Sequence, residues 1–147
     1  MIYISHRGYI NGVDEKLENN PNNISKLLEK NIHVEIDVRY HNDSFYLGHD
    51  NPKYKIDVNF LKHKNLWCHA KNSKTLDEIR KIDCHFFWHQ EDDYTITSRG
   101  FVWVYPGKPL VKNSICVTPE KHNNDYSFCY GICTDYLNNY IDINEQN

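Results

Sequence analysis

Polar and apolar residues alternate along several short stretches of the chain, a pattern typical of β-strands. In residues 33–39 the odd positions are polar or charged and the even positions are valine or isoleucine. Because successive side chains of a strand point to opposite faces, Glu35 and Asp37 should share one face. Residues 66–71 repeat the pattern, with His69 on the polar face. Two such strands suit a parallel barrel, in which apolar faces contact helices and inward polar residues gather at the carboxyl ends of the strands.

Short strands dominate the rest of the pattern, and only two helices are predicted. The helices cover residues 24–30 and 73–81, where leucine and isoleucine recur at helical spacing and asparagines precede the first turn. No repeat or low-complexity tract divides the chain, and only its last residues, through Gln146 and Asn147, are expected to form a loose tail. The predicted strands are residues 2–6, 33–39, 45–48, 66–71, 84–89, 101–105, 114–118 and 131–134.

The length fits one domain, residues 1–147, but is short for a complete barrel. A full eight-unit barrel takes about 250 residues. We therefore expect an α/β fold in the form of a compact, truncated TIM-like (β/α) barrel with several crossover helices reduced to loops. Strand faces left bare by this loss, especially in residues 84–105, would suit a second subunit, so a homodimer is a further expectation.

Three short motifs contain residues suited to phosphoryl chemistry. His6-Arg7-Gly8 follows the first apolar run, Glu35-Ile36-Asp37 lies within the second strand, and Gly48-His49-Asp50 follows the third. Imidazoles exchange protons near neutral pH, carboxylates hold divalent cations, and arginine binds phosphate. The combination indicates metal-dependent cleavage of a phosphodiester.

The same motifs resemble those of the glycerophosphodiester phosphodiesterases, which belong to the wider group of barrel phosphodiesterases similar to phosphatidylinositol-specific phospholipase C. His6-Arg7-Gly8 is similar to the opening motif of this family, Glu35-Ile36-Asp37 to its metal motif, and His49-Asp50 to its second catalytic histidine. The chain thus resembles a short, divergent member of the family. Weaker similarities lie at Glu18-Asn19, His69-Ala70-Lys71, Trp103 and Thr134-Asp135.

The resemblance implies a role for each matching residue. His6 and His49 would serve as catalytic acid and base on a small glycerophosphodiester or a related polyol or sugar phosphodiester. The implied cofactor is a divalent metal ion, Mg²⁺ or Ca²⁺ first, with Mn²⁺ or Zn²⁺ as alternatives because His69 stands where the family has a carboxylate. The residues implied to hold the metal are Glu35, Asp37 and His69, and those implied to bind substrate or phosphate are Arg7, Glu18, Lys71 and Trp103.

Two other functions stay open at this point. A noncatalytic descendant could use the barrel as a binding or assembly module, and a phospholipase D-like lyase could act on a choline-type head group. The lyase would need an aromatic cage, which the eleven tyrosines permit. His89, Gln90 and Glu91 follow an aromatic strand and could contact substrate or metal, with a solvated loop as the alternative. The role of Asp92 in the same acidic turn stays open.

Composition and net charge limit the classes of partner and the surroundings that we expect for this chain. The net charge of -3 argues against a nucleic-acid backbone as the main partner. The chain shows neither a basic leader with an apolar core nor a run of about 18 apolar residues, so we expect a cytoplasmic protein without stable membrane insertion. The five cysteines have no zinc-site spacing and are expected to be reduced, with Cys68, Cys116 and Cys133 buried in strands.

Overall fold

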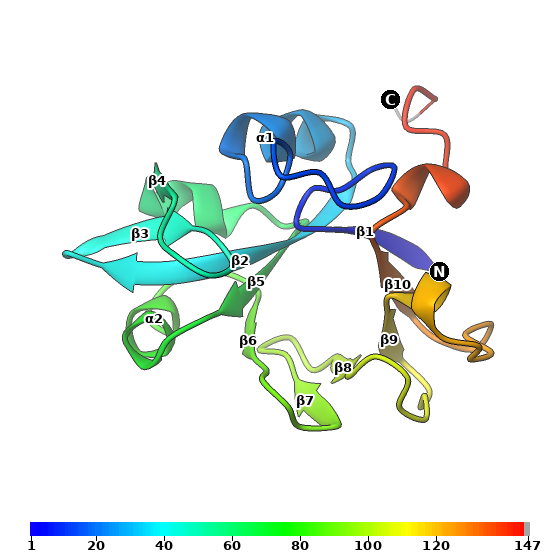
Figure 1. Cartoon of the computed structure of the whole chain (residues 1–147). Helices are drawn as coiled ribbons and strands as arrows, with labels where there is room; N and C mark the ends of the chain where they lie inside the picture. Colours follow the sequence, from blue (N-terminus) through cyan, green and yellow to red (C-terminus); the bar gives the residue numbers. More distant parts are fainter. Residues whose placement is uncertain (146–147) are drawn as a thin grey trace.

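A single curled sheet with few helices makes up most of residues 1–145, the part of the chain that the computed structural model describes (Figure 1). The loose tail expected at Gln146 and Asn147 lies outside these residues. The strands are β1 (Ile2–His6), β2 (His33–His41), β3 (Ser44–Leu47), β4 (Tyr54–Ile56), β5 (Leu66–Ala70), β6 (Phe86–Trp88), β7 (Tyr94–Ile96), β8 (Val102–Val104), β9 (Ser114–Val117) and β10 (Gly131–Thr134). The helices are α1 (Pro21–Glu29) and α2 (Ser73–Ile79), with 3-10 turns η1 (Val58–Lys62), η2 (Pro119–Lys121) and η3 (Leu137–Asn139).

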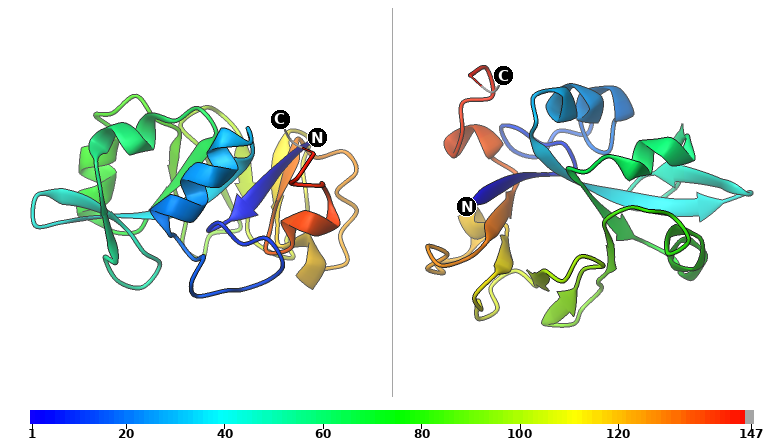
Figure 2. Two further views of the ribbon diagram at one scale, coloured as in Figure 1. Left: turned by 90° about the horizontal axis from the view of Figure 1, so that it is seen from above. Right: turned by 180° about the vertical axis from the view of Figure 1, so that it is seen from behind.

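The sheet curls around a central space without closing (Figures 1 and 2). Parallel pairs connect the strands in the order β6-β5-β2-β1-β10-β9-β8. Antiparallel pairs add β3 and β4 beside β2, and β7 beside β8. Within residues 1–145 no ladder joins β6 to β8, so the sheet is a half-barrel of mixed direction.

The expectation of a truncated TIM-like (β/α) barrel is wrong. Helices do not alternate with strands, since α1 and α2 are the only α-helices of the described residues. Several connections are too short to hold one; residues 105–113, for example, form the whole link between β8 and β9. The antiparallel strands β3, β4 and β7 also depart from an all-parallel barrel. The alternation of polar and apolar residues predicts strands that pair in parallel. It does not show whether helices cover these strands or whether the sheet closes into a barrel.

The alternation predicted for β2 determines where the main core lies. Val34, Ile36 and Val38 have 0% exposure and point to the outer face of the sheet. There they pack with Ile24 and Leu27 of α1. Full burial of such an aliphatic side chain stabilises the fold by about 1.5–3 kcal/mol. The polar positions of β2 consequently face the inside of the curl.

Asparagine side chains set the start of both helices. The side-chain oxygen of Asn20 accepts hydrogen bonds from the backbone N–H groups of Asn22 and Asn23, and Pro21 occupies the first helical position. The first helix therefore begins at Pro21 and not at residue 24. Asn72 caps α2 as expected from the sequence.

Aromatic and aliphatic side chains fill the inside of the curl next to the charged residues. Trp67, Phe87 and Trp103 form its centre, with 4.5 Å between the ring centroids of Phe87 and Trp103. All five cysteines are buried, as predicted for Cys68, Cys116 and Cys133. No helix within residues 1–145 is long and apolar enough to cross a membrane.

The predicted bare face in residues 84–105 is only partly found. The outward side chains of Phe86 and Trp88 pack against the main core, which leaves Tyr94 and Ile96 of β7 as the exposed large apolar residues of β6 and β7. The homodimer stays a prediction.

Candidate active site

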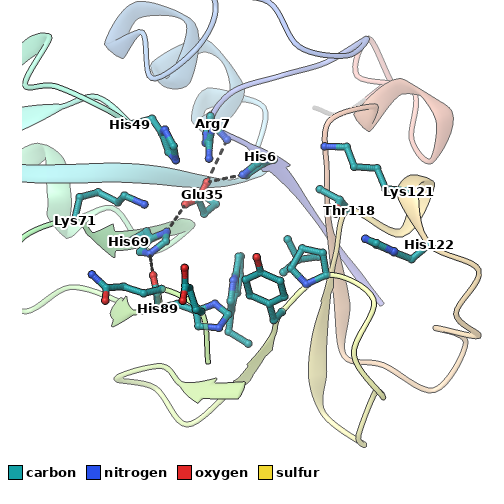
Figure 3. A pocket seen from close by; sticks show the side chains of 16 residues that line it. His6, Arg7, Glu35, His49, His69, Lys71, His89, Thr118, Lys121 and His122 are labelled. Atoms are coloured by element: carbon teal, nitrogen blue, oxygen red, sulfur yellow. Dashed lines mark hydrogen bonds and ion pairs between the residues drawn. The ribbon is translucent and has the colours of Figure 1, made fainter. Parts of the chain in front are cut away.

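A cavity of about 670 Å³ opens where the parallel strands β1, β2 and β5 reach their carboxyl ends (Figure 3). The strand register explains the convergence. His6 pairs with Glu35 across β1 and β2, and Asp37 pairs with His69 across β2 and β5. The predicted residues that line the cavity are His6, Arg7, Glu35, His49, His69, Lys71 and Trp103.

His6 is held by a carboxylate from the other end of the chain. Its Nδ1 donates a hydrogen bond to Oδ1 of Asp135 at 2.6 Å, which leaves Nε2 facing the cavity, 3.8 Å from Oε2 of Glu35. Lys121 donates to the second oxygen of Asp135 at 2.9 Å. Burial alone would raise the pKa of Asp135, but the contacts with His6 and Lys121 lower it to about 2. A carboxylate that stays ionised fixes the tautomer of His6.

His49 has a similar partner within its own turn. Its Nδ1 donates to Oδ1 of Asp50 at 2.8 Å. The turn needs glycine at position 48, because a Cβ there would lie 1.9 Å from the carbonyl oxygen of Asn51. Arg39 donates hydrogen bonds to the carbonyl groups of Gly48 and His49 and so holds the turn against β2. In Figure 3, His49 and His6 lie on either side of Arg7.

Glu35 is 1% exposed and lies beside three cationic or imidazole groups. Burial raises the pKa of this carboxyl group, but His69, His6 and Arg7 outweigh burial and lower the pKa to about 2. The backbone N–H of Arg7 donates to Oε2 at 3.3 Å. Oε1 instead faces His69, 3.5 Å from Nδ1.

Asp37 is completely buried beneath the cavity. Its Oδ2 accepts a hydrogen bond from the side chain of Asn19 at 2.9 Å and forms an ion pair with Nε of Arg7 at 3.1 Å. The other oxygen, Oδ1, has no hydrogen-bond partner. Oδ1 lies 3.7 Å from Nδ1 of His69 and 3.7 Å from Nζ of Lys71, so it belongs to the same cluster.

The ring of His69 is fixed by the backbone. Its Nε2 donates to the carbonyl oxygen of His89 at 2.7 Å, and the ring stacks on Phe87 with 4.8 Å between centroids. A carbonyl oxygen can only accept, so Nε2 carries the proton. In the neutral ring the lone pair of Nδ1 then faces Glu35 and Asp37.

These three residues fit a divalent metal ion. One ligand atom each from Glu35, Asp37 and His69 lies within 4.8 Å of the others. A buried carboxylate oxygen without a hydrogen bond costs about 1–3 kcal/mol or more, and a cation among these atoms would remove that cost at Oδ1 of Asp37. A cation between these atoms would also offset the repulsion between the Nδ1 lone pair of His69 and the two carboxylates.

The predictions for Glu18 and for residues 89–92 have different outcomes. Glu18 does not line the cavity; it accepts a hydrogen bond from the hydroxyl of Tyr9 and lines a neighbouring hollow beside His49. His89 and Glu91 both line the cavity, whereas the carbonyl of Asp92 accepts a hydrogen bond from the ring of His89.

Apart from Trp103, sequence reasoning assigned no definite role to the residues that the second half of the sheet supplies. Asp135 orients His6, and Thr118, Lys121 and His122 line the opposite wall with Tyr105. Asn19 was also missed as a support of Asp37. For Thr118 the available signal was its position directly after a short apolar strand, and for Asp135 it was the same position together with the weak family similarity of Thr134-Asp135.

Comparisons of the chain with protein-family models, with curated proteins and with solved structures give no match.

Proposed function

We propose that the protein is a metal-dependent phosphodiesterase that cleaves a small glycerophosphodiester or a related polyol or sugar phosphodiester. The observation that carries the proposal is the convergence of two histidines on one cavity, each donating Nδ1–H to a carboxylate. Both rings therefore present Nε2 for proton transfer. Phosphodiester cleavage needs one group to remove a proton from the attacking hydroxyl and another to protonate the leaving oxygen.

Positive charge close to these rings supports a phosphate between them. Arg7 and Lys71 line the same cavity, and both form ion pairs with Asp37 below it. The guanidinium of Arg7 is suited to bind phosphate oxygens, and the ammonium of Lys71 adds charge stabilisation as the transition state develops. The resemblance of His6-Arg7-Gly8 and Glu35-Ile36-Asp37 to motifs of the glycerophosphodiester phosphodiesterases agrees with this assignment.

The cluster of Glu35, Asp37 and His69 would hold the divalent ion. When bound, such an ion polarises a phosphate oxygen and offsets negative charge in the transition state. Arg7 also has a part in holding this cluster, because its backbone N–H donates to Glu35 and its side chain contacts Asp37. His6 and His49 act from outside the cluster as acid and base.

Hydrolysis of a panel of glycerophosphodiesters tests the proposal. Metal-stripped protein would be assayed alone and with added Mg²⁺, Ca²⁺, Mn²⁺ or Zn²⁺. We expect metal-restored turnover that falls by roughly 10²–10⁴-fold in His6→Asn and in His49→Asn. His41→Asn, a change at an exposed histidine at the end of β2, is the matched control and should keep full activity. Turnover that survives both cavity variants, or none from the folded wild type with any ion, would contradict the proposal.

A further inference from the structure

The three residues of the cluster share an arrangement that goes beyond their proximity. In each residue, one polar side-chain atom forms a hydrogen bond to a group outside the cluster, and the other polar atom faces the cluster. Oε2 of Glu35 accepts from the backbone of Arg7, and Oδ2 of Asp37 accepts from Asn19. Nε2 of His69 donates to the carbonyl of His89. The inward atoms are Oε1 of Glu35, Oδ1 of Asp37 and Nδ1 of His69.

This arrangement is the one that metal-binding side chains adopt. A histidine ligand usually donates its second ring nitrogen to a carbonyl or carboxylate, and carboxylate ligands are hydrogen-bonded in turn. Such partners fix the tautomer and the ring orientation before the ion arrives. His89 supplies this support to His69, and its own ring is held because it donates to the carbonyl of Asp92.

The donor set decides the class of ion. Mg²⁺ and Ca²⁺ prefer oxygen ligands, and Ca²⁺ takes 6–8 of them, whereas a neutral imidazole suits Zn²⁺ and related transition ions. Nδ1 of His69 lies 3.5 Å from Oε1 of Glu35 and 3.7 Å from Oδ1 of Asp37. The edges of a tetrahedron around an ion with bonds of about 2.1 Å measure about 3.4 Å, close to these separations. Three protein ligands beside an open cavity are typical of catalytic zinc sites.

We infer that this site takes a first-row transition ion such as Zn²⁺ or Co²⁺ in preference to Mg²⁺ or Ca²⁺, with His69 binding through Nδ1 and His89 as its positioning residue. This inference rests on the metal site of the proposed function. It reverses the order expected from the sequence, in which Mg²⁺ or Ca²⁺ came first, because the held tautomer makes His69 a ready nitrogen donor.

Calorimetric titration of metal-stripped protein with Zn²⁺ and separately with Mg²⁺ tests the inference without any turnover assay. We expect Zn²⁺ to bind more tightly than Mg²⁺. His69→Gln, which keeps a donor for the carbonyl of His89, should weaken Zn²⁺ binding by at least about 100-fold and change Mg²⁺ binding little. His69→Glu should shift the preference toward Mg²⁺. His63→Gln is the matched control. His63 lies outside the cavity, so this variant should bind Zn²⁺ as tightly as the wild type does.

The absorption spectrum of bound Co²⁺ gives a second readout, since a change of ligand from nitrogen to oxygen alters it. Thermal unfolding of each metal-free variant shows whether it is folded. Equal Zn²⁺ affinity in wild type and in folded His69→Gln, or tighter Mg²⁺ than Zn²⁺ binding in the wild type, would overturn the inference. Zn²⁺ binding that depends on His69 without hydrolysis of any phosphodiester would support the inference and contradict the proposed function. The two can therefore fail separately.

Discussion

The two halves of the curled sheet contribute different chemistry to one cavity. β1, β2 and β5 place polar and charged residues on the inside of the curl within the strands themselves, such as His69 and Glu35. β8, β9 and β10 fill the inside with apolar residues, such as Trp103 and Ile115, and contribute polar groups only beyond their ends. The first half therefore assembles the candidate chemistry, and the second half forms the opposite wall.

The halves also differ in how they are covered. The outer face of β2 and β5 packs against α1 and α2 in the largest apolar cluster of the described residues. The outer face of β9 and β10 is covered by loop residues, with Cys129 and Tyr126 beside Cys116 and Ile132. Buried charges such as Asp37 need rigid hydrogen-bonding partners, because an unpaired buried charge is strongly unfavourable. The helix-covered half provides them.

Asp135 follows β10 and holds His6 of β1, so its removal tests whether the two halves act together. Asp135→Asn should lower kcat by roughly 10–100-fold, because the amide no longer fixes the tautomer of His6 as a carboxylate does. Steady-state kinetics on the best phosphodiester would measure the loss. Asp83→Asn, at an exposed aspartate, is the matched control and should be fully active.

Asp135→Asn should also change how the stability of the protein depends on pH. An effect on substrate binding alone would not cause this change. The folded pKa of Asp135, about 2, lies below the ordinary value of 3.8, so its contribution to stability is present above pH 3.8 and is lost as pH falls toward 2. Asp135→Asn should be less stable than the wild type at neutral pH, and the difference should shrink in acid. An unchanged kcat would show that the two halves do not cooperate.

His85 lies between the halves, and its titration tests how tightly they pack. It is 2% exposed and contacts Trp67 from the first half and Phe101 from the second, at centroid distances of 4.1 Å and 5.8 Å. Burial, with smaller effects of Arg99 and His33, lowers its pKa to about 4 from the ordinary 6.5. The folded state therefore resists protonation, and stability should fall as pH drops from 6.5 to 4.

Urea unfolding at pH 7.0 and pH 4.5 measures this effect. We expect the wild type to lose roughly 2 kcal/mol more than His85→Gln over this interval, because glutamine does not titrate. The carboxyl groups of Glu35 and Asp135 are present in both proteins, so any contribution they make over this interval cancels in the comparison. Equal losses in the two proteins would mean that water reaches His85 and that the halves pack loosely there.

The same contrast explains what the sequence could predict. Alternation in residues 33–39 placed Glu35 and Asp37 on one face and the core residues on the other, because a strand has a period of two residues. The register that brings His69 beside Asp37 depends on strand order, which short apolar runs do not reveal. Asp135 reaches His6 only because β10 pairs with β1 at the other end of the chain. The barrel was wrongly expected for the same reason, because short apolar runs do not reveal the order in which the strands pair.

Local backbone strain could not be predicted either, and one strained residue lies where β9 meets the cavity. Thr118 has φ 46° and ψ 57°, a left-handed conformation that is rare for a β-branched residue. Its hydroxyl oxygen is buried without a hydrogen-bond partner. Asn113, just before β9, has φ 62°, but asparagine tolerates this region well.

Thr118→Gly should therefore stabilise the protein, by about 1 kcal/mol. Relief of the left-handed strain, about 1–2 kcal/mol, and removal of the unpartnered hydroxyl outweigh the added chain entropy of glycine, about 0.5–1 kcal/mol. Asn113→Gly, on the other side of the same strand, gains neither benefit and should be neutral or slightly destabilising. Urea midpoints at pH 7 compare the two variants with the wild type. A Thr118→Gly protein less stable than Asn113→Gly would mean that the Thr118 side chain packs productively, and that the second half of the sheet is as closely fitted as the first.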